Sequence, residues 1–297
     1  MAASACLAAC LASAAQVRPG LAGAALPARP GHYLGVFEPG SDQSWAPVQA
    51  FASAVGHRPD IVLMYSSWYE VFHRAFAERA AAHGAVPMIQ LQPAGISLAQ
   101  IAAGDYDSYL HEYALAVRSY GRPVILSFAH EMNGTWYSWG YPHVSPATWV
   151  AAWRHVVTLF RNAGASNVTW LWAPNVTQPG APYLSAYWPG ARYVTWVGLD
   201  GYLANPADTF SSVFGPSIAA IRRLTRQPLL IAETAVGPMA GQVAKIPGIF
   251  AGMREDQLLG IVWFDVAQQG GIYRQDWRLE DNPAALAEFR AEVRQYW

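Results

Sequence analysis

Short runs of consecutive apolar residues recur along the chain, and each run is bounded by turn-forming residues. Continuous apolar runs are typical of parallel strands that are covered on both faces, whereas half-exposed strands alternate apolar and polar residues. The runs that predict strands are 33–37, 61–65, 86–91, 124–128, 168–172, 194–199, 229–232 and 260–264.

Between these runs the apolar residues follow helical spacing. Ser145 is expected to cap a helix that Gly164 ends. Asp105 is expected to cap another helix, which ends before Gly121, and residues 70–83 predict a third. The chain therefore alternates between predicted strands and predicted helices.

Eight strands alternating with helices predict a (β/α)₈ barrel, or TIM barrel, of the α/β class. A doubly wound open sheet is the alternative fold. That fold usually carries a Gly-rich phosphate loop after its first strand, and residues 35–40 (GVFEPG) do not match one.

A barrel of this kind places its active site at the carboxyl ends of its strands. Two glutamates, Glu131 and Glu233, directly follow the predicted strands four and seven. A carboxylate beside a buried strand is costly unless it is paired, hydrogen-bonded or functional. An ion pair with a barrel arginine is one explanation for each glutamate. The other is glycoside hydrolysis, which needs one carboxylic acid and one carboxylate on facing sides of a sugar.

Strands four and seven face each other across an eight-stranded barrel, so the two carboxyl groups can converge. A separation of about 5–5.5 Å would indicate a retaining mechanism. Two like charges at that distance also separate the two pKa values. One carboxyl group then stays protonated as the acid while the other is ionised as the nucleophile.

Composition narrows the choice of function. Of 297 residues, 53% are hydrophobic and 13% are charged, which predicts a globular core. The formal net charge of −1 and the absence of basic runs argue against nucleic acid or an anionic membrane as partner. The 13 Trp and 15 Tyr suit stacking on sugars, and core packing is their alternative use.

No metal or cofactor is expected. Cys6 and Cys10 are the only cysteines, so the rest of the chain has no disulfide or Cys-based metal site. His130 and Glu131 begin like a zinc-protease motif, but position 134, where the second His would stand, is Gly134. We therefore expect a cofactor-free monomer.

The first 14 residues resemble an export signal, with a small-residue cleavage site at 12–14. Residues 7–10 (LAAC) also resemble a lipobox, in which Cys10 would be lipidated. Residues 15–31 predict an Ala/Pro/Gly-rich linker, and 32–297 a single catalytic domain. No later segment is long and apolar enough to predict a membrane span. These features predict a secreted protein, either free or anchored at the cell surface.

The stretch HEMNGTW at 130–136, with IAET at 231–234, resembles glycoside hydrolase family 26, a family of retaining (β/α)₈ enzymes. The resemblance runs from about Tyr33 to the C-terminus. It implies that Glu131 is the acid/base and Glu233 the nucleophile. It implies that His130 touches the substrate or orients Glu131, and that Trp136 lines a sugar subsite.

The resemblance also implies three roles around the nucleophile. Asp200 and Tyr202 would lie near Glu233, with Tyr202 donating a hydrogen bond to it. Trp263 would form the floor under the sugar being cleaved. Packing in the core is the alternative for Trp136, Trp263 and His130, and closing a turn through Gly201 is the alternative for Asp200 and Tyr202. Further candidates for substrate binding are Gln90, Gln92, Trp68, Tyr69 and Trp139.

The implied substrate is a β-linked polysaccharide. Where mannanases of the family carry a His near the end of strand three, this chain has Gln90 and Gln92. The family's commonest activity favours an endo-β-1,4-mannanase, followed by a mixed-linkage β-1,3-1,4-glucanase and then a β-xylanase. A non-catalytic carbohydrate-binding protein is the alternative of another class, and it predicts the loss of one carboxylate.

Overall fold

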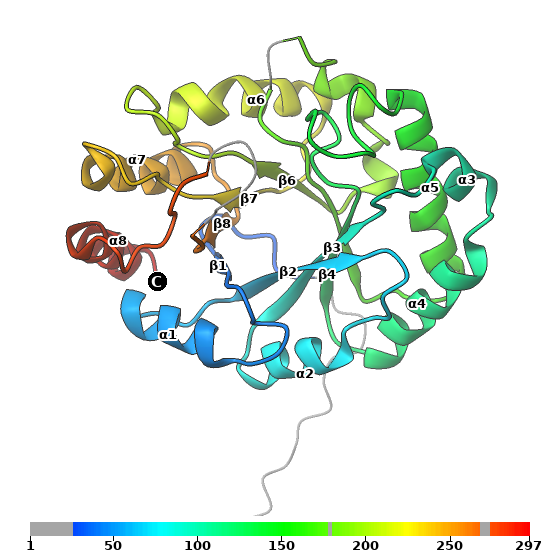
Figure 1. The fold of residues 1–297 in the computed structure, drawn as a ribbon, viewed down its shortest axis with the longest axis horizontal. Helices are drawn as coiled ribbons and strands as arrows, with labels where there is room; N and C mark the ends of the chain where they lie inside the picture. Colours follow the sequence, from blue (N-terminus) through cyan, green and yellow to red (C-terminus); the bar gives the residue numbers. More distant parts are fainter. Residues whose placement is uncertain (1–25, 178–179, 268–273) are drawn as a thin grey trace, which may run out of the picture.

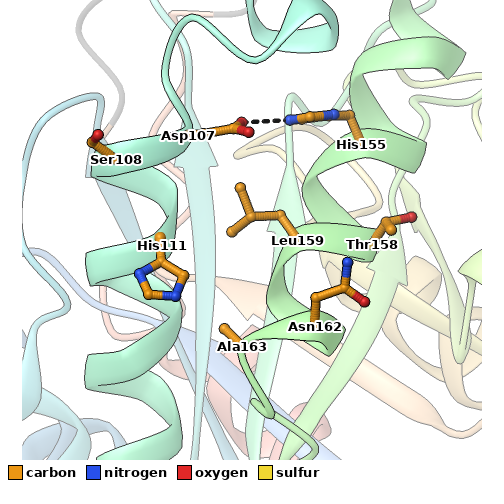
Figure 2. A pocket seen from close by; sticks show the side chains of 8 residues that line it. All are labelled: Asp107, Ser108, His111, His155, Thr158, Leu159, Asn162 and Ala163. Atoms are coloured by element: carbon orange, nitrogen blue, oxygen red, sulfur yellow. Dashed lines mark hydrogen bonds and ion pairs between the residues drawn. The ribbon is translucent and has the colours of Figure 1, made fainter.

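In the computed structural model, which describes residues 26–177, 180–267 and 274–297, eight parallel strands close into one barrel (Figure 1). Each strand pairs with the next, and the last strand pairs with the first. The strands are β1 (Tyr33–Phe37), β2 (Ile61–Ser67), β3 (Val86–Gln92), β4 (Val124–Phe128), β5 (Val168–Trp172), β6 (Trp196–Asp200), β7 (Leu229–Thr234) and β8 (Gly260–Phe264). The predicted barrel is confirmed, and Glu233 lies inside β7 rather than after it.

The helices surround the barrel and cover its outer face (Figure 1). They are α1 (Ala46–Val55), α2 (Arg74–Ala82), α3 (Leu98–Ala103), α4 (Asp107–Tyr120), α5 (Pro146–Asn162), α6 (Phe210–Leu224), α7 (Gln242–Glu255) and α8 (Pro283–Tyr296). Two short 3₁₀ helices, η1 (Leu184–Tyr187) and η2 (Ala191–Tyr193), lie between β5 and β6.

The predicted cap at Ser145 is confirmed, because its side chain accepts a hydrogen bond from the backbone N–H of Thr148. The predicted cap at Asp105 is wrong: α4 begins at Asp107 with no side-chain cap. Neither does a helix begin at Glu70, because its carboxylate accepts the backbone N–H of Ser67 and holds a turn ahead of α2.

Two apolar cores position the site. The larger core lies between the strands and the surrounding helices, and the smaller one fills the barrel interior. The interior core draws on every strand and is formed by Tyr33, Ile61, Leu63, Met88, Ile125, Leu171, Ala173, Trp196, Leu230, Ala232, Leu259 and Val262. Gly35 leaves room for it, because a Cβ there would lie 2.7 Å from Val262 Cγ2. The barrel interior is therefore filled with apolar side chains, and the polar groups lie beyond this core, at the carboxyl ends of the strands.

Within the described residues, every helix is too short or too polar to cross a membrane. The expected export segment, 1–14, and most of the expected linker, 15–31, lie outside the described residues.

Candidate active site

Glu131 lies in a strained turn directly after β4. Ala129 and Glu131 have φ angles of 49° and 50°, a left-handed conformation that is costly for residues other than glycine. Neighbouring groups hold this turn on both sides. The N–H of Glu131 donates to the carbonyl of Ala173 (2.7 Å), and the indole of Trp149 donates to the carbonyl of Ala129 (3.0 Å). The backbone is thus fixed in the conformation that turns the Glu131 side chain into the barrel mouth.

Two neutral donors hold the Glu131 carboxyl group. Asn175 Nδ2 donates to Oε1 (2.5 Å), and the indole N–H of Trp136 donates to Oε2 (2.6 Å). The Trp136 ring folds back over Gly134, where a Cβ would lie 2.3 Å from the ring. The Asn-Gly turn in HEMNGTW therefore lets Trp136 reach the carboxyl group five residues before it.

A β-bulge aims Glu233 into the barrel. Leu199 pairs with Ile231 while Asp200 pairs with Glu233, so Ala232 is the extra residue on β7. Ala232 packs in the interior core, and a regular strand would point the next side chain outward. Because of the bulge, Glu233 also faces inward, as bulges beside active sites often achieve.

Three donors hold the Glu233 carboxyl group, which is 5% exposed. Tyr202 donates its hydroxyl to Oε2 (2.7 Å), the contact that the resemblance implied. Gln90 Nε2 and the Tyr65 hydroxyl donate to Oε1, over 3.0 and 2.6 Å. Tyr65 was not among the candidates that we identified from the sequence. It could have been found, because it is the last residue of the second apolar run and therefore lies at the end of a predicted strand.

The two glutamates differ in protonation. Burial, and then the negative charge of Glu233, raise the pKa of Glu131 to about 8. Burial also raises the pKa of Glu233, but its hydrogen bonds from Tyr65, Tyr202 and Gln90 oppose that rise by stabilising the ionised form. At neutral pH we therefore assign the proton to Glu131 and the charge to Glu233.

Asp200 is a third carboxyl group at the same place and is fully buried. Burial, then the charges of Glu233 and Glu131, raise its pKa well above the ordinary range. Neither of its carboxyl oxygens has a hydrogen-bond partner among the described residues. Burial and the two neighbouring charges therefore favour the protonated, uncharged form of Asp200.

Among the described residues, no arginine or lysine forms an ion pair with these carboxyl groups. The ion pairs found in the described part of the chain involve none of Glu131, Glu233 and Asp200. The barrel ion pair that was the alternative explanation for either glutamate is thus not formed there. The same residues include no cluster of His, Cys, Asp and Glu suited to a metal ion.

His130 and Trp139 are buried beside the site, and both contact Tyr137. His130 is 1% exposed, and burial lowers its pKa to about 3, so the ring is neutral. Its Nε2 lies 3.2 Å from the Tyr137 hydroxyl. Trp139 is buried, stacks on Tyr137 with ring centres 4.2 Å apart, and donates to the His130 carbonyl. Trp139 is therefore too enclosed to stack on a sugar, and it braces Tyr137 instead.

The remaining candidates lie along β2 and β3. Trp68 is buried against Tyr109, whereas Tyr69 is 61% exposed. Gln92 is half-buried and lies two residues beyond Gln90, on the same face of β3. Of these candidates, Gln90 contacts a glutamate of the site, and Tyr69 offers an exposed ring at the carboxyl end of β2.

The expected role of Trp263 as a floor under the sugar is wrong. Its side chain is fully buried in the outer core, with its ring centre 4.9 Å from that of Phe289 on α8. Alternation along β8 explains this, because Val262 points inward and Trp263 therefore points outward. Phe264 is the inward-facing aromatic residue; it stacks on Phe37, with ring centres 4.9 Å apart.

A second carboxyl pair lies at the junction of β1 and β8. Glu38 and Asp265 follow these neighbouring strands and share a hydrogen bond. Burial, and then the charge of Asp265, raise the pKa of Glu38 to about 10. Asp265 also accepts the backbone N–H of Leu279 (3.0 Å), so the pair ties the barrel to the segment before α8.

Comparison with known proteins shows that the chain is similar to glycosidases. The family model for glycosyl hydrolase family 26 matches residues 104–249, a span that includes Glu131 and Glu233. Endoglucanase H of Acetivibrio thermocellus is 29% identical over 272 residues, which cover 86% of this chain and 29% of that protein. Mannan endo-1,4-beta-mannosidase A and B of Caldalkalibacillus mannanilyticus is 31% identical over 93 residues, covering 29% of this chain and 18% of that protein.

The chain thus spans less than a third of the length of these two relatives. Among solved structures, the catalytic domain of the family 26 endo-beta-1,4-mannanase from Bacillus sp. JAMB-750 superposes with a TM-score of 0.67 at 17% identity. The superposition covers 89% of this chain and 85% of that one, and at this identity it shows the fold alone. The family match and the relatives show that the chain is related to glycosyl hydrolase family 26, and the shared barrel agrees with that relationship in fold.

Proposed function

We propose that the protein is a retaining endo-β-glycosidase that hydrolyses a β-linked polysaccharide, with β-1,4-mannan as the first candidate substrate. One observation carries the proposal. A protonated and an ionised carboxyl group, from β4 and β7, lie in one barrel mouth and are held by neutral donors.

This arrangement suits a double displacement. The Glu233 carboxylate attacks the anomeric carbon while Glu131 gives its proton to the departing glycosidic oxygen, so a glycosyl ester forms as the old bond breaks. Ester formation removes the negative charge of Glu233, which had raised the pKa of Glu131. Glu131 can then take a proton from water, which attacks the ester and releases the sugar with its configuration retained.

A β-glucan is the second candidate substrate, and a specific observation favours it. The similarity to Endoglucanase H covers 86% of this chain, whereas that to the C. mannanilyticus mannosidase covers 29%. The strand-three His that the resemblance associates with mannanases is also absent: Gln90 and Gln92 stand there instead, and Gln90 contacts Glu233. A polymeric substrate would be met outside the cell, in keeping with the export segment expected at 1–14.

The first test is reducing-sugar release from glucomannan, unsubstituted mannan, barley mixed-linkage β-glucan and xylan. Hydrolysis of both mannans but not of β-glucan supports the mannanase proposal. Hydrolysis of β-glucan alone selects the second candidate. No hydrolysis of any of the four polymers would contradict the proposed function.

The roles of the glutamates are tested by substitution. Glu131→Gln and Glu233→Gln are each expected to lower kcat by about 10³-fold or more, because either change removes a reacting carboxyl group. Glu292→Gln is the matched control, since Glu292 is a buried glutamate of α8 on the outside of the barrel. Azide should rescue Glu233→Ala with inverted and Glu131→Ala with retained configuration, and the opposite pattern would exchange the roles.

A further inference from the structure

Two asparagines join the loop after β4 to the end of β5. Asn133 Nδ2 donates to the carbonyl of Asn175 (2.8 Å), and the backbone N–H of Asn175 donates to Asn133 Oδ1 (2.9 Å). The Asn133 amide therefore pairs with the backbone of residue 175 as a neighbouring strand would. Both side chains are almost fully buried, at 1% and 2% exposure, so water does not compete for these bonds.

The backbone around Asn175 is also fixed from the other side. Val176 donates its N–H to the carbonyl of Asp200 (2.8 Å), and Asp200 donates its own to the carbonyl of Pro174 (3.0 Å). The residue that donates to Glu131 is thus held between the β4 loop and β6. Its side-chain N–H has little freedom to leave Oε1 of Glu131, 2.5 Å away.

We propose that Asn133 and Asn175 act together as positioning residues for the acid/base: Asn175 orients the Glu131 carboxyl group and favours its ionised form, and Asn133 holds Asn175 in place. The inference rests on the proposed function in that it assumes the acid/base role of Glu131. The proposed role differs from a role in folding alone, because it links both asparagine side chains to proton transfer by Glu131.

The surroundings of Glu131 make such a donor necessary. The groups that face it are Glu233 from β7, Asp200 and Tyr202 at and after the end of β6, and Tyr137 from its own loop. All of these groups are neutral or negative. Each therefore either opposes ionisation of Glu131 or offers no positive charge that would stabilise its carboxylate. Hydrogen bonds from neutral donors are then the means by which the group can give up its proton in the first half of the reaction and stay ionised until water attacks the ester.

The decisive experiment compares leaving groups. Protonation of the departing oxygen matters for a sugar leaving group and little for a dinitrophenolate, which leaves unaided. In Asn175→Ala we expect kcat/KM to fall by about 10- to 100-fold on an oligosaccharide, but by less than about threefold for formation of the glycosyl-enzyme from a dinitrophenyl glycoside. Asn133→Ala should show the same selectivity in weaker form.

The second readout is the protonation of Glu131 itself. A carbon-13 NMR titration of the glutamate carboxyl groups, with Glu131 assigned by loss of its signal in Glu131→Gln, should show a higher pKa in Asn175→Ala. The direction follows because the lost hydrogen bond had stabilised the ionised form. This titration tests the inference even if none of the polymers is hydrolysed, which keeps it separate from failure of the proposed function.

Asn167→Ala is the matched control. Asn167 precedes β5 as Asn175 follows it, is 8% exposed, and donates to the carbonyls of Val117 and Arg122. The Asn167→Ala variant should have a lower unfolding temperature. It should lose no more activity on the oligosaccharide than on the dinitrophenyl glycoside, and the pKa of Glu131 should not change. Equal losses on both substrate types in Asn175→Ala, or an unchanged Glu131 pKa, would overturn the inference.

Discussion

Removing the Tyr65 hydroxyl, which donates to Glu233, should shift the acidic limb of the pH–activity profile. The Tyr65 hydroxyl donates to Glu233 Oε1 over 2.6 Å, and Glu233 is 5% exposed. A hydrogen bond to a charged group contributes about 1.5–3 kcal/mol, and one pH unit corresponds to about 1.36 kcal/mol. Complete loss would therefore shift the pKa of Glu233 by about one to two pH units. We expect the lower end of that range, because Gln90 still donates to the same oxygen.

The sign follows from which form the bond stabilises. Tyr65→Phe removes a donor to the ionised carboxylate, so the pKa of Glu233 rises. In the proposed reaction Glu233 must be ionised to attack the sugar, and the acidic limb of kcat/KM then reports its pKa in the free enzyme. The measurement is kcat/KM against pH on the best soluble polymer fragment, and the acidic limb should move upward by about one pH unit. Tyr202→Phe should act in the same direction, since Tyr202 donates to the other oxygen.

Tyr120→Phe is the matched control. Its hydroxyl is also buried but donates to a neutral group, the carbonyl of Ala77 (2.9 Å), between α4 and α2. That variant should lose stability and leave the pH profile in place. If Tyr65→Phe lowered activity equally at every pH and left the acidic limb unmoved, the reasoning about Glu233 would be refuted.

Two further substitutions test other parts of the barrel. Trp263→Ala should destabilise the fold by about 3–5 kcal/mol through loss of packing on Phe289, measured by denaturant unfolding; a large rise in KM at unchanged stability would instead restore its sugar-binding role. Glu38→Gln should flatten the pH dependence of stability. Because the pKa of Glu38 is raised from 4.5 to about 10, the folded chain holds a proton that the unfolded chain releases, so stability falls as pH rises across that range. Thermal unfolding at pH 5, 7 and 9 measures this slope, and an equal slope in the variant would exclude Glu38 as its source.

Local sequence was sufficient for the barrel and for the positions of both glutamates. Continuous apolar runs mark strands that are buried on both faces, and a residue that follows such a run in a barrel must lie near its mouth. The placement of Glu131 and Glu233 in one polar site follows from this rule. Their spacing along the chain did not reveal the bulge at Ala232, because a bulge is defined by the pairing of two strands.

Contacts between distant segments were beyond the local pattern. Tyr65 lies 168 residues from Glu233, and nothing in its own run shows that the two meet. Trp263 was misplaced by one residue, because a continuous apolar run does not reveal which of its residues face inward. That choice is set by the neighbours: Val262 faces the interior core, so Trp263 must face α8. Similarly, the spacing that suggested a cap at Asp105 did not show that α4 begins two residues later.

The neutral donors around the carboxyl groups suit what the proposed reaction demands. An arginine beside Glu233 would hold that group ionised and would lower the pKa of Glu131 as well, so the acid would lose its proton before the reaction began. Hydroxyl, amide and indole donors stabilise a carboxylate without adding charge, so the protonation of each group still depends on the other. Charge can then pass from Glu233 to Glu131 when the ester forms and return when it is hydrolysed. Within the described residues, these carboxyl groups form no ion pair, which suits the proposed reaction because the negative charge must move from Glu233 to Glu131 and back in each turnover.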